Sequence, residues 1–308
     1  MRQQKSLIAG VRSTLRYDGA LYLMLVPFII WYLMFVYRPM GGLVIAFQDY
    51  NLFEGIGGSQ WVGLKNFKEF IGGPYFARTF KNTAVIGILT MLFCYPAPII
   101  LALLINEIKN SKIKSVIQTS TFIPFFVSAV VVAGIVTNML SPSTGIVNAI
   151  LEKLTGERIY FLSEAKYFRP IYIMMTMWQN CGYNAILYLS ALSAIDPQLY
   201  EACIIDGGGK MRQILHVTLP GILPTITITL ITSLGGILSV GYETIILLYQ
   251  PSTYETADVL STYMYRTGIQ EGNYGIASAV TIFNSIISLV FVTGANYISR
   301  KVSETSLW

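Results

Sequence analysis

Long apolar stretches alternate with shorter polar segments along most of the chain. A helix needs about 20 mainly apolar residues to cross a bilayer, because the hydrocarbon core is about 30 Å thick and a helix rises about 1.5 Å per residue. Six stretches pass this test, at residues 20–37, 84–105, 121–140, 171–191, 222–248 and 276–298. The pattern therefore predicts an all-α polytopic membrane protein with six transmembrane helices.

Two of the six stretches have unusual features. The first resembles a signal peptide in length, but it lacks a small-residue cleavage site and continues through Trp31 to Arg38-Pro39. We therefore predict that it is a retained anchor. The third is the least typical of a single span, since Pro124 lies near its start and Asn138 near its end.

The distribution of Lys and Arg predicts which side of the membrane each loop occupies. An even number of spans places both termini on the same side. Basic residues precede the first span and recur in the loops on that side: Arg2, Lys5, Arg12, Arg16, Lys109, Lys112, Lys114, Lys210, Arg212, Arg300 and Lys301. Because cytoplasmic loops carry an excess of Lys and Arg, we expect both termini in the cytoplasm.

Three parts of the chain follow from this topology. Residues 1–83 contain a cytoplasmic segment, the first span and a long outer loop, and residues 84–298 form a core membrane domain. A cytoplasmic loop at 196–220 belongs to this core, and residues 299–308 form a cytoplasmic tail. No low-complexity tract marks a linker to a soluble domain.

The predicted outer loop between the third and fourth spans contains a further helical pattern. Apolar residues recur there at helical spacing, at Ile146, Val147, Ile150, Leu151 and Leu154. This spacing predicts a short amphipathic helix at the membrane interface. We expect it to anchor the loop against the bilayer or a neighbouring helix rather than to contact a substrate.

Composition agrees with a membrane protein and excludes several other classes. Hydrophobic residues fill 54% of the 308 positions and charged residues only 12%, about half the usual share of a soluble domain. Basic cytoplasmic loops account for the net charge of +5 without a nucleic-acid partner. Three scattered cysteines and a single histidine, His216, predict no disulfide framework, no metal site and no His-paired nucleophile.

The polar segment between the fourth and fifth spans has the pattern of two short helices. Asp196-Pro197 is a typical helix start, because Asp accepts a bond from a free N–H and Pro suits the first helical position. Gly207-Gly208-Gly209 interrupts the helix and allows a sharp reversal. A second helix is predicted from Lys210 to about Val217, ended by Leu219-Pro220. Such a loop suits docking into a cleft on another protein.

This segment resembles the EAA loop of permease subunits of ATP-binding-cassette (ABC) importers. Glu201-Ala202-Cys203 is followed at the spacing of that motif by Gly207 and by Leu219-Pro220. Cys203 replaces the second alanine of the motif and Val217 an isoleucine, and both exchanges keep a small, apolar docking face. The resemblance implies a type I importer permease with the MetI-like fold.

The same resemblance implies how the loop would work. Glu201 would pair with a basic residue of a separate ATPase, and Gly207 would be the hinge of the turn. The ATPase-coupling residues that it implies are Leu199, Glu201, Ala202, Cys203, Ile205, Asp206, Gly207, Leu219 and Pro220. The chain has no G-x-x-x-x-G-K-[ST] loop, so we expect it to bind no cofactor and its partner ATPase to use ATP and Mg.

Further segments resemble the carbohydrate branch of these permeases, especially the alginate-type and lipoprotein-linked sugar permeases. They are residues 37–51, residues 61–67 (Trp61-Val62-Gly63-Leu64-Lys65-Asn66-Phe67) and residues 303–308. The resemblance implies import of an oligosaccharide or polysaccharide across a bacterial cytoplasmic membrane. The implied partners are a second, different permease, two ATPases and an external solute-binding protein.

Polar and aromatic residues inside the spans are candidates for a sugar path. Aromatic faces stack on sugar C–H groups while amides and carboxylates bind hydroxyls. The candidates are Trp178, Gln179, Asn180, Tyr183, Asn184, Tyr242, Glu243 and Asn284. Each has a structural alternative, since amides also bond between helices and Glu243 would suit a pair with a partner subunit or a place nearer the interface.

An ion-coupled secondary transporter is the main alternative function, with Glu243 as the ion site. Against it, the six spans show no internal repeat and the docking loop would have no purpose. No filter-like segment indicates a channel, and no Ser–His or metal pair indicates an intramembrane enzyme.

Overall fold

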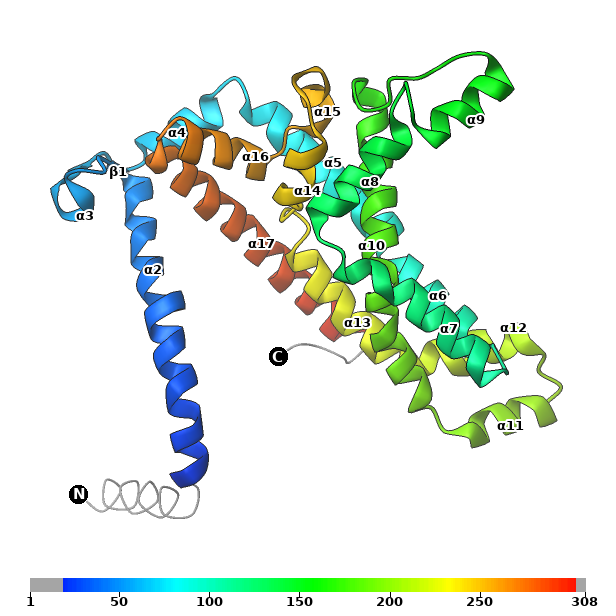
Figure 1. Ribbon diagram of the computed structural model, residues 1–308. Coiled ribbons are helices and arrows are strands. Elements are labelled where there is room, and N and C mark those ends of the chain that lie inside the picture. The colour runs from blue at the N-terminus through cyan, green and yellow to red at the C-terminus, as the bar shows by residue number, and fades with distance from the viewer. Residues whose placement is uncertain (1–18, 303–308) are drawn as a thin grey trace, which may run out of the picture.

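The structure, a computed structural model, describes residues 19–302 and is almost entirely helical (Figure 1). By length and composition four helices in this range could cross a membrane: Gly19–Phe47, Phe76–Asn106, Lys210–Gly235 and Tyr274–Lys301. A bent pair, Ser111–Phe126 with Ala129–Leu140, counts as a fifth if it forms one span. The predicted all-α polytopic fold is confirmed. The basic residues Arg2, Lys5, Arg12 and Arg16 and the motif at 303–308 lie outside the described residues.

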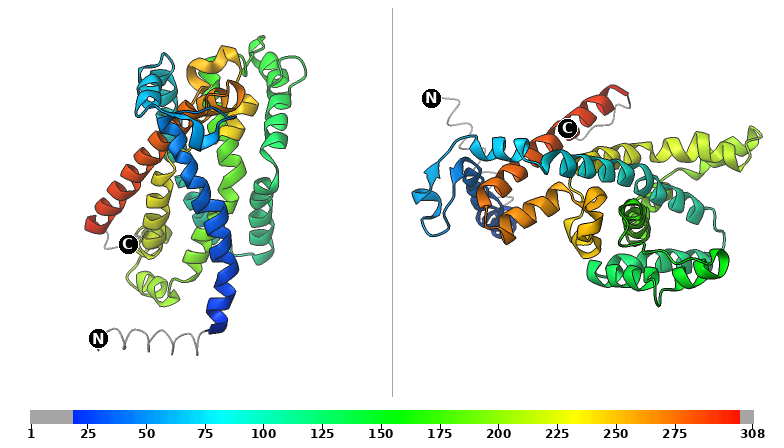
Figure 2. Two further views of the ribbon diagram at one scale, coloured as in Figure 1. Left: turned by 90° about the vertical axis from the view of Figure 1, so that its left-hand side faces the viewer. Right: turned by 90° about the horizontal axis from the view of Figure 1, so that it is seen from above.

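Long helices run between two opposite ends of the molecule (Figures 1 and 2). We call the end that carries α11 (Pro197–Ile205) and α12 (Lys210–Gln213) the loop end. The opposite end, which carries α4 (Lys65–Gly72) and α9 (Ile146–Thr155), is the far end. Between them α10 (Ala165–Ser193), 29 residues long, forms the centre. It covers the fourth predicted span, although the polar residues in its middle lower its hydropathy.

The first helix, Gly19–Phe47, stands apart from the rest of the molecule (Figure 1). It contains a π turn, η1 (Leu33–Tyr37), then α2 (Arg38–Met40) and a 3₁₀ segment, η2 (Gly41–Phe47), which packs against α17 (Tyr274–Val302). None of the residues in its apolar window is buried. Its apolar surface is therefore left for lipid or other protein to cover.

The loop after the first helix folds into a small clamp at the far end. It comprises β1 (Gln48–Asp49), α3 (Gly55–Gly58), β2 (Gln60–Trp61) and α4, and the two strands pair antiparallel with Gln48 opposite Trp61. The buried Asn66 amide donates to the carbonyls of Ala46 and Gln48, each at 2.9 Å. These bonds hold α4 beside the end of the first helix.

The prediction of one helix for the third span, residues 121–140, is wrong. The chain forms α7 (Ser111–Phe122), a 3₁₀ turn η3 (Ile123–Phe126) and α8 (Ala129–Leu140), with a bend of 101° between the two parts. Pro124 removes a backbone donor, and Ser128 caps the new helix by accepting from the Val131 N–H at 3.4 Å. The Gln179 side chain on α10 donates to the Val127 carbonyl at 2.8 Å, so this backbone carbonyl at the bend has a hydrogen-bond partner.

The predicted fifth span is also wrong as one helix. A continuous helix runs from Lys210 to Gly235, comprising α12, the π turn η4 (Ile214–Thr218) and α13 (Leu219–Gly235). Residues 236–241 are mostly non-helical, and α14 (Tyr242–Leu248) then starts in a new direction. Gly235-Gly236 favours this break because glycine is a poor helix former. Glu243 therefore lies in the first turn of a separate short helix, exposed at its surface.

Short helices complete the far end. The predicted amphipathic helix is confirmed as α9, whose Ile146, Ile150 and Leu154 are exposed. A hydrogen bond from Arg158 lowers the pKa of the Glu152 carboxyl on this helix. Between α14 and α17 follow η5 (Pro251–Thr253), α15 (Tyr254–Ala257), α16 (Leu260–Tyr265) and the π turn η6 (Arg266–Gln270).

A buried carboxylate ties these short helices to α5 (Phe76–Cys94). Asp258, which has no exposed surface, accepts hydrogen bonds from Arg78 at 2.8 Å and Arg266 at 3.1 Å. Its backbone carbonyl accepts from the Asn82 amide at 3.0 Å. A buried charge is tolerated when it is paired and hydrogen-bonded, so this network fixes the far-end segment in place.

Apolar packing unites the long helices in clusters along the molecule. At the far end, buried residues of α5, α8, α10 and α14 pack together around Ile86, Tyr172 and Ile245. Toward the loop end, α6 (Pro96–Asn106), α10 and α13 meet around Ala102, Tyr188 and Ile222. The small cluster of Phe70, Leu260 and Val280 joins α4, α16 and α17.

Gly182 is the residue that lets α10 approach the bend between α7 and α8. A Cβ atom at this position would overlap the Thr121 carbonyl. We expect Gly182→Ala to destabilise the protein by about 1–3 kcal/mol, the usual cost of overpacking. The loss of stability is measured as a fall in the melting temperature of the purified protein in detergent.

Gly134 on α8 is the matched control, because a Cβ there would meet no atom within 4 Å. Gly134→Ala should leave stability unchanged or raise it by up to about 1 kcal/mol, since alanine is the better helix former. Equal effects of the two substitutions would contradict the packing role of Gly182.

Candidate functional site

The loop between α10 and α12 has the helix–turn–helix form that the sequence predicts. The Asp196 carboxylate accepts from the Gln198 N–H at 2.9 Å, and Pro197 occupies the first position of α11. At the other end of α11, Gly207 has φ +78°, a conformation that glycine adopts without strain. The Gly207 N–H donates to the Ile204 carbonyl at 2.9 Å and the Gly208 N–H to the Cys203 carbonyl at 2.7 Å. This pair of bonds is a Schellman C-cap.

Further bonds make the loop stiff. The Tyr200 and Thr218 hydroxyls lie 3.1 Å apart, which ties α11 to the π turn η4. The buried Gln213 amide donates to the Gly208 carbonyl at 3.3 Å. A Cβ on Gly208 would lie 2.4 Å from Cys203 Sγ, so the half-buried Cys203 packs against the turn itself.

The prediction that Leu219-Pro220 ends the second helix is wrong. The helix that begins at Lys210 continues through Pro220 to Gly235. A π turn at Ile214–Thr218 shifts the hydrogen-bond register directly before the proline, so the missing N–H falls in the first turn of α13. The loop is thereby joined to α13 without an intervening break.

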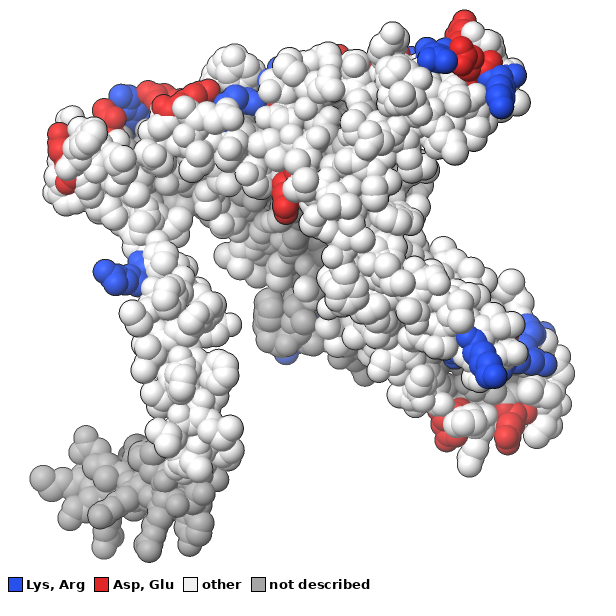
Figure 3. Space-filling model, viewed as in Figure 1, with Lys and Arg blue, Asp and Glu red and all other residues white. Residues whose placement is uncertain are grey.

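Several apolar side chains of the loop are exposed. These side chains are 52% to 85% exposed: Leu199, Ile204, Ile205, Met211 and Leu215. Ala202 and the carboxylates of Glu201 and Asp206 are also exposed, and neither carboxylate has an ion-pair partner among residues 19–302. Figure 3 shows acidic residues gathered over α11 and basic residues over the ends of α7 and α12. Leu199 and Ile205 were predicted for this surface; Ile204, Met211 and Leu215 were not.

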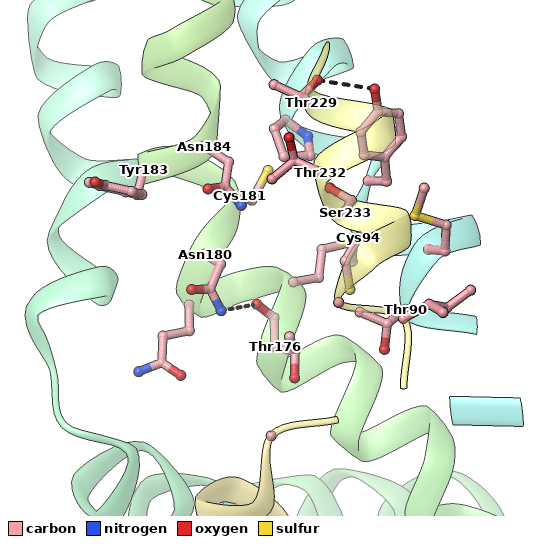
Figure 4. Close-up of a pocket in the computed structure, with 18 of the residues that line it drawn as sticks. Thr90, Cys94, Thr176, Asn180, Cys181, Tyr183, Asn184, Thr229, Thr232 and Ser233 are labelled. Carbon is pink, nitrogen blue, oxygen red and sulfur yellow. Dashed lines mark hydrogen bonds between the residues drawn. The ribbon is translucent and has the colours of Figure 1, made fainter. Parts of the chain in front are cut away.

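A cavity of about 1090 Å³ lies among α5, α10, α13 and residues 236–241. Among residues 19–302, no Asp, Glu, Lys, Arg or His lines it. Hydroxyls and amides supply its polarity, and Figure 4 shows them around one space: Thr90, Thr176, Asn180, Asn184, Thr229, Thr232 and Ser233. Such a surface can exchange hydrogen bonds with a neutral polar ligand without removing a charge from water.

Some of these polar groups are already bonded to the protein. The Asn180 amide donates to the Thr176 carbonyl at 2.9 Å, and the Thr229 hydroxyl lies 2.9 Å from that of Tyr188. Thr90 Oγ1, by contrast, is buried with no partner in the part of the chain described. The side chains of Asn184 and Ser233 likewise form no hydrogen bond within residues 19–302. Asn184 and Ser233 are exposed, so their polar groups remain open to a ligand, whereas the buried Thr90 oxygen does not.

The structure brings together half of the path residues predicted from sequence. Gln179, Asn180, Tyr183 and Asn184 line the cavity, whereas Trp178, Tyr242, Glu243 and Asn284 do not. Gln179 and Tyr183 also support the α7–α8 bend, and Tyr183 stacks on Phe125 with ring centroids 3.8 Å apart. In Figure 4 Tyr183 extends away from Thr232 and Ser233.

The residues placed off the cavity have other surroundings. Trp178 is half exposed on another face of α10, and Tyr242 packs against Tyr265 with ring centroids 5.2 Å apart. Asn284 Oδ1 on α17 is buried without a partner in the described chain. Sequence reasoning missed Thr90, Thr232 and Ser233 because single hydroxyls are common in membrane helices and carry no pattern of their own.

The sequence matches a protein family described as binding-protein-dependent transport system inner membrane component. The match covers residues 94–304, more than half of the chain. The chain belongs to this family. It is therefore a transport component of the inner membrane rather than an enzyme, and ATPase activity lies in separate subunits. Permeases of this family work with a partner permease, ATPases and a solute-binding protein.

Relatives and solved structures agree with this assignment over almost the whole permease. Protein LplB of Bacillus subtilis (strain 168) is 40% identical over 96% of this chain and 93% of its own length. The polygalacturonan/rhamnogalacturonan transport system permease protein YteP of the same organism is 41% identical over 94% and 90%. A crystal structure of a bacterial ABC transporter that imports the acidic polysaccharide alginate contains a chain 45% identical to this one, with a TM-score of 0.88 and coverage of 95% and 99%. The resemblance to carbohydrate permeases inferred from the sequence is confirmed.

We expect water to reach the cavity of the permease when no nucleotide is bound. In a variant whose three cysteines are replaced by serine, Thr232→Cys should react with a small hydrophilic thiosulfonate, because Thr232 is exposed in the cavity. Val132→Cys should not react, because Val132 is fully buried. The measurement is the labelled fraction by mass spectrometry, and equal labelling at both sites would contradict an open cavity.

Proposed function

We propose that this permease moves an oligosaccharide or polysaccharide into the cell and that α11 and α12 couple it to a separate ATPase. The observation that carries the sugar assignment is the cavity, which is large, has no charged side chain among its described lining residues and presents hydroxyls and amides within a mostly apolar wall. Sugar hydroxyls both donate and accept, so they can pair with those of these groups that remain open, while the apolar wall suits their C–H faces. The names of the relatives YteP and the alginate importer support the same class of substrate.

The cavity also suggests how this chain would treat acidic sugars. It offers no cation to a carboxylate, although the alginate importer carries an acidic polysaccharide. We expect this chain to bind the hydroxyl-bearing faces of each sugar, and the partner permease or water to meet any carboxylate. The groups proposed for contact are the open side chains of Asn184 and Ser233, together with Asn180.

The loop end is proposed to face the cytoplasm, with both termini on that side. There the exposed apolar residues of α11 and α12 would enter a cleft on the ATPase, and Glu201 would pair with a basic residue beside it. ATP and Mg would bind to the two ATPase chains. Closure of these chains would move the stiff loop and α13 as one body, which is how alternating access is commonly driven.

The far end would receive the solute-binding protein. We propose that the second permease is a different chain, as the sequence resemblance implies. An ion-coupled carrier that uses Glu243 has no support, because Glu243 lies outside the cavity and the chain belongs to a binding-protein-dependent family.

The whole proposal can be tested by reconstitution. The permease is co-purified with its partners in mild detergent and placed in proteoliposomes with a panel of neutral and acidic oligosaccharides and the binding protein. Uptake should require ATP and the binding protein and should continue when ion gradients are collapsed. Uptake that follows an ion gradient without ATP would overturn the proposal.

Glu201→Lys should uncouple transport without preventing membrane insertion. Reversing an exposed charge on the docking surface places like charges together at the ATPase cleft, a change that costs several kcal/mol in interfaces. We expect uptake and ATPase co-purification to fall at least about tenfold. Glu157→Lys is the control for ATPase binding, because Glu157 is an exposed acid at the opposite end with no ion pair within residues 19–302; it should retain ATPase co-purification. Wild-type uptake by Glu201→Lys would contradict the assignment of the loop.

Gly207→Pro provides a second test of the loop that does not depend on charge. Proline requires φ near −65°, whereas Gly207 has φ +78°. The Schellman turn cannot form in this variant, so coupling should be lost while the amount of permease in the membrane remains. The readout is again uptake per inserted permease.

Asn184→Ala should raise the concentration of loaded binding protein that gives half-maximal uptake by about 2- to 10-fold, the value of one hydrogen bond. The Asn184 amide is free to bind sugar because no residue of the described chain bonds to it. Ser285→Ala, on α17 and outside the cavity, is the control. If neither Asn184→Ala nor Ser233→Ala changes the uptake constant, these groups do not line the path.

A further inference from the structure

One ion pair connects the coupling loop to the end of α6. Lys210 is the first residue of α12, and Glu107 occupies the C-cap position of α6. Lys210 Nζ lies 2.7 Å from Glu107 Oε2. Among the ion pairs within residues 19–302, no other joins residues 196–218 to another helix.

Each partner has the wrong charge for its own helix. Glu107 lies at the C-terminal end of a 31-residue helix, where the helix dipole is negative, and Lys210 lies at the N-terminal end of a 26-residue helix, where the dipole is positive. Each charge suits the other helix end instead. The pair is therefore unfavourable within either helix alone and favourable only when the two ends meet.

The pair contributes little to folding. The two side chains are 68% and 39% exposed, and exposed pairs typically contribute at most about 1 kcal/mol. The apolar cluster of α6, α10 and α13 holds the bundle together without it. Its effect is therefore on the angle between the coupling loop and α6, not on whether the protein folds.

That angle bears on the cavity. Tyr95 and Pro98, at the start of α6, line the cavity, and the Tyr95 hydroxyl donates to the Ile226 carbonyl of α13 at 2.6 Å. The loop itself is stiff because of its Schellman turn and the Tyr200–Thr218 bond. A displacement of α11 would therefore move α13 through the continuous helix. It would move α6 through the ion pair between Lys210 and Glu107.

We infer that Lys210 and Glu107 are positioning residues that make α6 follow the coupling loop. As a result α6 and α13, which both contribute to the cavity wall, would move together with the ATPase. This inference rests on the proposed function. The complete complex in proteoliposomes tests it. The measured quantity is the stimulation of ATP hydrolysis by binding protein loaded with the oligosaccharide that stimulates the wild type most.

Single charge reversals come first. Lys210→Glu and Glu107→Lys each place like charges about 3 Å apart, and we expect each to reduce the stimulation at least about fivefold. ATPase co-purification and melting temperature should stay near wild type, because the pair is exposed and contributes little to either. A loss of ATPase binding instead would show that these residues belong to the docking surface, and would overturn the inference.

The double reversal, Lys210→Glu with Glu107→Lys, is the decisive variant. It restores opposite charges between the two helix ends, so stimulation should return to within about twofold of wild type. Failure of this rescue, or unchanged stimulation in both single variants, would overturn the inference.

Lys112 provides the matched control. It is exposed at the start of α7, at the loop end, and forms no ion pair within residues 19–302, so Lys112→Glu should leave the stimulation unchanged. A fall in stimulation equal to that of Lys210→Glu would show that any reversed charge at the loop end has this effect. If the wild-type complex itself is not stimulated by loaded binding protein, the proposed function fails rather than this inference.

Discussion

The structure depends on one constraint: inside a bilayer no water is available to bond a free backbone group. Polar side chains from other segments therefore bond backbone carbonyls where long helices are interrupted. Gln179 donates to the Val127 carbonyl at the α7–α8 bend. Ser261 bonds the Val240 carbonyl where α13 has already ended. These repairs allow irregular backbone at membrane depth.

The same interruptions shape the cavity and the connection between the loop end and the bundle. Because α13 stops at Gly235, residues 236–241 can form part of the cavity wall. The segment that follows must then be held at the far end, and Asp258 with its two arginines does this. At the loop end the π turn before Pro220 has the opposite effect, since it keeps the helix continuous from Lys210 into the bundle.

The helix–turn–helix loop between α10 and α13 could be predicted from sequence, and most of the cavity could not. The loop is built from local signals within about twenty residues, namely a cap at Asp196, a glycine turn and fixed motif spacing. The cavity takes Thr90 from α5, Asn184 from α10 and Ser233 from α13. Nothing in the local sequence around any one of these residues indicates the other two. Glu243 was predicted as a path residue because it is a charge in an apolar stretch. The helix expected for that stretch ends at Gly235, and Glu243 lies in the separate helix α14.

The sequence by itself determined the membrane class, the helical fold, the loop with its Asp cap and glycine turn, and the family. These follow from apolar run lengths and from contacts between near neighbours. The tertiary structure decided where helices bend, which polar groups share a cavity and that Lys210 meets Glu107. Those outcomes depend on how distant segments satisfy each other's hydrogen bonds and charges, and spacing along one chain does not encode which segments will meet.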